Sequence, residues 1–186
     1  LIIEPMLDAL SRPENFLASR IHDVLQSLGP KLIPVILQKI EQADINGKIV
    51  MVQLLGAFGD SSVIPALTEL LDTQNYLLKK MTVEAIGQIE GQEVCPILID
   101  LLKDENWQIR LLAAEAIGRG RYYQACPALR EAFYQENDGL VKEIMEEILC
   151  TLDDSNETIT YLWSRRRSKQ DDGRSRTSCG EYGFTT

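Results

Sequence analysis

Carboxylate side chains recur in this chain at a fixed separation. At that separation they can form a row that acts together, which isolated charges cannot do. Glu84, Glu115 and Glu146 are spaced 31 residues apart. A row of carboxylates can hold the Lys, Arg or amide groups of a partner. The same carboxylates can instead pair with basic side chains one helical turn away and only solubilise a helix surface. The candidate local partners are Lys80, Arg119 and Lys142.

A second set of basic side chains falls at the same interval. Lys48, Lys79 and Arg110 each follow a short polar segment of the chain. Because these segments contain acidic turn residues, we expect the basic groups to pair with carboxylates such as Asp72 and Asp104. This second row is therefore interpreted as structural.

Side chains that could carry catalysis are sparse. The chain has one histidine, His22, so a Ser-His-Asp arrangement would have to include it. None of the four cysteines lies in a CxxC pair, which argues against a metal site or a disulfide framework and favours a reducing cytoplasm. No phosphate-binding loop is present either. The sequence thus predicts no catalytic residue, no metal ligand and no cofactor.

Aromatic side chains offer a different contact chemistry. Trp107 and Tyr76 are also 31 residues apart, each at the start of an expected helix. We expect both rings to cover the core between neighbouring structural units, because a large ring shields a wide apolar area. The alternative is a contact patch for a partner, formed by Trp107 with Tyr122 and Tyr123.

The interval of 31 residues belongs to the whole chain and not to its charges alone. The residues in this register are Pro34, Pro65, Pro96 and Pro127, and the glycines Gly56, Gly87 and Gly118. Proline suits the first turn of a helix, and apolar residues then recur at helical spacing. A polar break and a second helix follow, so each unit is a helix pair. Glycines in register indicate that neighbouring second helices approach closely.

The ends of the chain depart from this pattern. A degenerate unit precedes Pro34, and residues 159–163 are expected to begin one more helix. Cys95 and Cys126 stand where earlier units carry isoleucine, which predicts small core residues. Residues 164–186 are polar and break the period, which predicts a disordered tail. Its arginines at 165–167 form either a solvated helix end or a contact for an acidic surface or nucleic acid.

Charge divides the chain at the same place. Residues 1–163 hold 25 acidic and 13 basic side chains, whereas residues 164–186 hold three and six. An acidic body disfavours nucleic acid, whose phosphates need a basic stripe, and it fits a basic protein partner. No apolar run approaches the length of a membrane span, and no segment has the pattern of a signal peptide.

The segment from Asp104 to Gly118 carries the clearest signature. It has an aspartate turn, a hydrophobic–Arg step at Ile109-Arg110, and Ala-Ala-Glu-Ala-hydrophobic-Gly at residues 113–118. This pattern resembles the short HEAT repeat named after phycobilisome lyases, over roughly residues 17–152. The resemblance implies an all-α fold, a right-handed α-α superhelix of about five HEAT-like helix pairs over residues 1–163. It also implies that the second helices line the concave side.

The resemblance is compatible with several functions, because this repeat serves many unrelated roles. Relatives include bilin lyases, adaptor proteins and domains attached to enzymes. The similar deoxyhypusine hydroxylase holds iron with several His-Glu pairs, which a chain with one histidine lacks. HEAT-like DNA glycosylases need a basic groove, which does not fit the acidic body of this chain. We therefore predict a non-enzymatic protein–protein interaction scaffold, with a bilin lyase-type factor acting on phycobiliproteins as the alternative. The predicted binding residues are Glu84, Glu115, Glu146, Lys80, Arg119 and Trp107.

Overall fold

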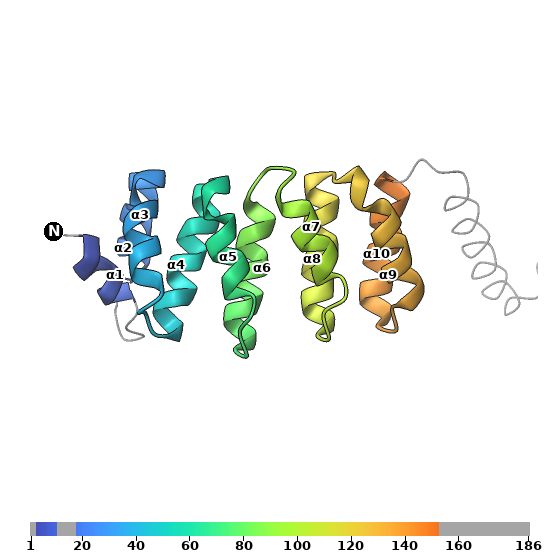
Figure 1. Ribbon diagram of the computed structural model, residues 1–186, viewed down its shortest axis with the longest axis horizontal. Coiled ribbons are helices and arrows are strands. Elements are labelled where there is room, and N and C mark those ends of the chain that lie inside the picture. The colour runs from blue at the N-terminus through green and yellow to red at the C-terminus, as the bar shows by residue number, and fades with distance from the viewer. Residues whose placement is uncertain (1–2, 11–17, 153–186) are drawn as a thin grey trace, which may run out of the picture.

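The computed structural model describes residues 3–10 and 18–152, and the regular structure within these ranges is entirely helical. In chain order the α-helices are α1 (Ile3–Leu10), α2 (Ala18–Leu28), α3 (Ile33–Ile40), α4 (Ile45–Phe58), α5 (Ile64–Leu70), α6 (Tyr76–Gln88), α7 (Val94–Leu101), α8 (Trp107–Gly120), α9 (Cys126–Gln135) and α10 (Gly139–Leu152). They follow one another as five antiparallel pairs along the long axis of the molecule (Figure 1).

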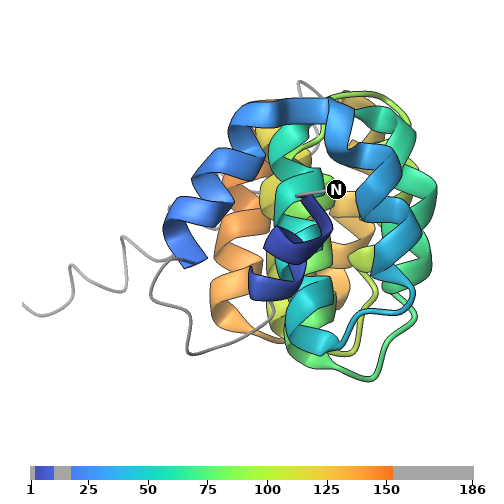
Figure 2. The ribbon, with the colours of Figure 1, turned by 90° about the vertical axis from the view of Figure 1, so that its left-hand side faces the viewer.

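The pairs are arranged in two layers (Figure 2). The second helices form a continuous layer, because α4 packs on α6, α6 on α8, and α8 on α10. The first helices α3, α5, α7 and α9 form the other layer, and each packs on the second helix of its own pair. A single apolar core runs between the layers, as expected for repeats that bury their surface on their neighbours.

Local sequence accounts for where the helices begin. Pro34, Pro65 and Pro127 occupy the first turns of their helices, where a missing N–H leaves no broken hydrogen bond. The polar breaks cap the second helices: the side chains of Asp44 and Asn75 accept hydrogen bonds from backbone N–H groups of the first turn, at 2.8 and 2.9 Å. The predicted capping role of these segments is confirmed.

The recurrent glycines lie where second helices meet. A Cβ atom on Gly56 would lie 2.7 Å from the Cα and Cβ atoms of Ala85, and a Cβ atom on Gly87 would lie 2.9 Å from Ala116 Cβ. These separations are shorter than carbon atoms tolerate. The glycines therefore allow α4, α6 and α8 to approach closely, which confirms the packing role predicted from the sequence.

The last pair carries one extra residue in its turn. The caps of α4, α6 and α8 are Asp44, Asn75 and Asn106, but the cap of α10 is Asp138 and not Asn137. Packing shows the same shift. A strict period would place Glu147 opposite Gly118, but Gly118 faces Ile148. Side chains of α10 therefore occupy positions one residue later than the 31-residue period predicts.

The first pair is shifted in the opposite direction. Gly29 follows α2 with φ 67°, as Gly59 follows α4 with φ 66°, and these two glycines are one residue closer than the period. Leu25 and Leu55 then become equivalent, and both are fully buried. This register makes Asp23 of α2 equivalent to Gln53 of α4.

The predicted all-α, right-handed solenoid of about five helix pairs is confirmed. Cys95 and Cys126 are buried in the core, as expected. Residues 159–163, expected to begin another helix, and the tail 164–186 lie outside the described residues.

Candidate functional site

The side of α4, α6, α8 and α10 that faces solvent carries most of the predicted binding residues, and we call it the second-helix face. Glu84 of α6 and Glu115 of α8 occupy equivalent places on it, and both are partly exposed. Equivalent helices stack directly on one another, so equivalent side chains form a row across the repeats. Gln53 of α4 continues this row on one side.

The third predicted carboxylate needs a correction. Glu146 was placed in the row by the 31-residue period, but the extra residue before α10 puts Glu147 there. Glu147 is exposed. Glu146 instead takes the position of Ala114 and Val83, which are fully buried against the following second helix. The acidic row of the folded protein is therefore Glu84, Glu115 and Glu147.

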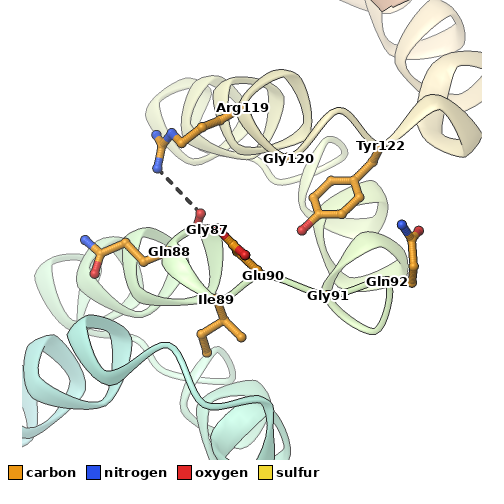
Figure 3. A pocket seen from close by; sticks show the side chains of 9 residues that line it. All are labelled: Gly87, Gln88, Ile89, Glu90, Gly91, Gln92, Arg119, Gly120 and Tyr122. Carbon is orange, nitrogen blue, oxygen red and sulfur yellow. Dashed lines mark hydrogen bonds between the residues drawn. The ribbon is translucent and has the colours of Figure 1, made fainter. Parts of the chain in front are cut away.

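The basic residues around this row are only partly engaged with it. Lys80 Nζ lies 3.8 Å from Glu84 Oε1, in a pair whose side chains are each about one-third exposed. Arg119 donates to the backbone oxygen of Gly87 at 3.5 Å, as Figure 3 shows. Lys142 donates to the backbone oxygen of Glu136 at 3.0 Å. Within the described part of the chain, local pairing thus accounts for one of the expected pairs and leaves Glu115 and Glu147 without a basic partner.

Apolar side chains lie beside the carboxylates on the same face. Leu77 and Leu140, in the first turns of α6 and α10, are each 50% exposed. Between these first turns and the acidic row lie half-buried apolar side chains: Ile49, Met81, Leu111, Leu112 and Ile144. Exposed apolar surface bordered by charge is typical of interaction sites. Sequence patterning missed both leucines, since a leucine in a helix is read as core.

The aromatic predictions have mixed outcomes. Trp107 and Tyr76 are each 39% exposed, and the Tyr76 hydroxyl is hydrogen-bonded to the Gln108 side chain of the next repeat. The alternative that placed Tyr122 at the surface is wrong, because its side chain is 5% exposed and its ring covers the backbone at Gly120. A contact patch that needs Tyr122 at the surface is therefore excluded, whereas Trp107 and Tyr123 remain accessible.

The second basic row holds the inter-repeat turns together. Arg110 Nε and NH2 each donate to a carboxylate oxygen of Glu136 at 2.7 Å, and NH1 donates to the backbone oxygens of Asp104 and Glu105. Lys79 pairs with Asp104. The expected pairing is confirmed for Lys79 and Arg110, each of which takes its carboxylate from the turn of the next repeat. For Lys48 the pairing stays a prediction.

Glu136 was missed by the sequence reasoning, although it is the most deeply buried carboxylate of the described region. Its side chain is 2% exposed, and it also accepts hydrogen bonds from the backbone N–H groups of Asn137 and Asp138. The Arg110 guanidinium and these N–H groups hold the pKa of Glu136 below its usual range, against the opposing effect of burial. The contact with Glu136 likewise raises the pKa of Arg110.

A hollow of about 460 Å³ opens where the turn after α6 meets the end of α8 (Figure 3). Arg119 lies at its rim and Tyr122 forms one wall. Burial raises the pKa of Tyr122, and the backbone at Gly91 opposes this shift. Glu90, Arg119 and Tyr122 are the ionisable residues that line the hollow. A neutral phenol and a guanidinium are poor nucleophiles, and among the described residues no hydrogen bond orients the Glu90 carboxylate as a base.

Among residues 3–10 and 18–152, no three His, Cys, Asp or Glu side chains are grouped so as to hold a metal ion. In the same described ranges, no helix combines the length and apolar character needed to cross a bilayer.

Stacked helix pairs with a continuous layer of second helices define an α-helical repeat protein. The sequence matches the HEAT repeats family over residues 33–117, 69–150 and 96–178, so the chain belongs to the HEAT repeat family. A chain from the complex of CpcE and CpcF of phycocyanin lyase from Nostoc sp. PCC7120 has a similar structure, with a TM-score of 0.69. The two are 14% identical, and the match covers 78% of this chain and 96% of the other. No curated protein sequence matches this chain significantly.

Proposed function

We propose that this protein is a non-enzymatic scaffold that binds a basic protein partner on its second-helix face. The observation that carries the proposal is the acidic row Glu84–Glu115–Glu147, in which two of three carboxylates have no basic partner among the described residues. Carboxylates left unpaired at a surface are available to Lys and Arg groups of another molecule.

The electrostatic setting supports this choice of partner. The net charge of the chain is −9, and residues 1–163 hold 25 acidic against 13 basic side chains. The basic side chains nearest the row are diverted to other contacts, since Arg119 and Lys142 donate to backbone oxygens. Arg119 and Lys142 keep their positive charges, but Glu115 and Glu147 have no ion pair among the described residues, and such carboxylates attract cationic segments.

Charge reversal tests the proposal. The triple change Glu84→Lys, Glu115→Lys and Glu147→Lys should abolish capture of the partner in affinity purification while leaving the helical circular dichroism signal intact. A matched control replaces Glu147→Lys with Glu146→Lys, because Glu146 lies outside the row and the total charge change is the same. If the control loses capture equally, overall charge and not the acidic row would explain binding. If the first variant still captures the partner, the proposal is refuted.

A second candidate comes from the structural match. The matched chain belongs to a phycocyanin lyase complex, and the alignment covers nearly all of it. On that ground we propose, as the alternative, a factor that handles the bilin of a phycobiliprotein together with a partner subunit. The apolar residues of the second-helix face would then contact the phycobiliprotein.

This alternative has its own test. The purified protein is mixed with a phycobiliprotein subunit and free bilin, and the visible absorbance is recorded. Appearance of a protein-bound bilin band would favour the lyase-type factor over the scaffold. No change in absorbance, with capture of an unrelated basic protein, would exclude it.

A further inference from the structure

Two parallel rows of different chemistry run across the second helices. Glu84 follows Leu77 by seven residues, and Glu147 follows Leu140 by the same separation. Seven residues are close to two helical turns, so the members of each couple share a face and lie about 10 Å apart along the helix axis. On α6 and α10 the first turns therefore present Leu77 and Leu140, with the polar Gln108 at the equivalent place on α8, and the carboxylates follow two turns later.

The strip between the rows is largely apolar and partly exposed, with Lys80 of α6 and Glu143 of α10 as its charged members. Met81 of α6, Leu111 and Leu112 of α8, and Ile144 of α10 lie there, all half-buried. The width of the strip, about 10 Å, corresponds to the diameter of an α-helix with its side chains. A strand or a loop would leave part of this width uncovered.

The distance between repeats adds a second match. Packed helices have axes about 8–10 Å apart. A bound helix that runs across the repeats advances about 10.5 Å in seven residues. Equivalent residues of the bound helix, seven apart, therefore meet equivalent positions on successive repeats.

We propose that the partner segment is an amphipathic α-helix that lies across α6, α8 and α10, with basic residues at every seventh position on one flank. Its apolar side packs on Leu77, Leu140 and the strip between the rows. Its basic flank meets Glu84, Glu115 and Glu147 in turn. This inference rests on the proposed function and specifies the chemistry of the partner.

Synthetic peptides provide the test with the full chain. The probe is a fluorescent, end-blocked peptide of about 21 residues, with leucine on one side and lysine at every seventh position of one flank. The control peptide has the same composition, but its lysines are redistributed around the helix. Fluorescence anisotropy should show the probe binding about tenfold more tightly than the control. Equal affinities would overturn the inference, because charge alone would then explain binding.

Matched variants of the protein locate the site. Glu84→Gln, Glu115→Gln and Glu147→Gln together should weaken probe binding about tenfold, since each ion pair at a surface contributes a small factor. The control carries the same charge change on exposed residues of the first helices: Glu69→Gln, Asp100→Asn and Glu131→Gln. It should bind the probe as the unmodified protein does. Similar losses in both variants would overturn the assignment.

The apolar row has a separate readout. Leu77→Ser and Leu140→Ser should weaken probe binding at high salt, where charge is screened, while Tyr134→Ser on α9 should not. If the probe fails to bind but capture of the natural partner still depends on the acidic row, the helix inference is wrong and the scaffold proposal survives. If capture of the natural partner does not depend on the acidic row, the proposed function is wrong, and the helix inference that rests on it is wrong as well.

Discussion

Single residues decide how neighbouring repeats are joined at their turns. The bidentate contact of Arg110 with Glu136 fixes the turn before α10 to the start of α8. A buried carboxylate without its guanidinium would remain desolvated and charged, so each partner depends on the other. The extra residue of this turn is accommodated here, where Glu136 also binds the N–H groups of Asn137 and Asp138.

The Arg110–Glu136 contact makes a pH-dependent contribution to stability. Glu136→Gln should lower the free energy of unfolding by roughly 2–3 kcal/mol at neutral pH, because hydrogen bonds to a charged, buried group are lost. The pKa of Glu136 is lowered on folding, so its contribution is complete above the ordinary Glu pKa of about 4.3 and disappears as the pH falls through the lower folded value.

Urea unfolding of the variant and the unmodified protein at several pH values measures this contribution. The difference in unfolding free energy should shrink below about pH 4. Glu131→Gln removes an exposed carboxylate from α9, the helix that precedes Glu136; this variant is the control and should change stability little at any pH. A difference that stays constant with pH would show that the carboxylate charge does not matter.

At the scale of helices, the contact between second helices determines the stack. Gly56, Gly87 and Gly118 each face a side chain of the following second helix at less than van der Waals distance from an added Cβ. Helix propensity disfavours glycine by about 1 kcal/mol, so close approach is what compensates for it here. The positions of these glycines thereby set the spacing of the rows on the second-helix face.

Gly87→Leu tests this contact. The larger side chain must displace Ala116 or separate α6 from α8, and we expect a loss of roughly 1–3 kcal/mol from overpacking. Gly139→Leu is the control, since an added Cβ there meets nothing within 4 Å. Thermal unfolding followed by circular dichroism should show a lower melting temperature for the first variant only. An unchanged melting temperature for Gly87→Leu would show that Gly87 has no packing role between α6 and α8.

The whole molecule behaves as a short stack whose ends differ from its centre. Val83 and Ala114 face the following second helix and are fully buried, whereas the equivalent residue of α10 is the partly exposed Glu146. Cys150 of α10 takes the place of Gly118 and is exposed. A charged side chain and a Cβ at these positions are poor surfaces for another closely packed helix. This side of α10 therefore differs from the sides of α6 and α8 on which the following second helices pack.

The domain boundary near residue 163 remains a prediction, and limited proteolysis tests it. Trypsin should cleave first at the arginines 165–167, because the sequence around them is polar and outside the repeat period. The remaining core should keep its helical signal and its melting temperature, since the apolar core is formed by residues up to Leu152. Loss of the core after that single cleavage would show that the tail contributes to folding.

Sequence alone was sufficient for the architecture. Pro34, Pro65, Pro96 and Pro127 marked the first helices, and Gly56, Gly87 and Gly118 marked the contacts between second helices. These signals act locally, since a proline begins a helix and a missing side chain permits contact wherever the residue stands. Repetition made each signal visible several times, so the fold did not depend on any one of them.

Tertiary structure decided which side chains share a surface. Glu146 and Glu147 are adjacent and chemically identical, so the sequence could not reveal that one extra residue before α10 exchanges them. Tyr122 looked like a surface ring next to Tyr123, but only the former packs over Gly120. Glu136 gained its partner from a helix in the preceding repeat. Each outcome depends on how a turn places its neighbours in space, whereas the period of the sequence records only their order.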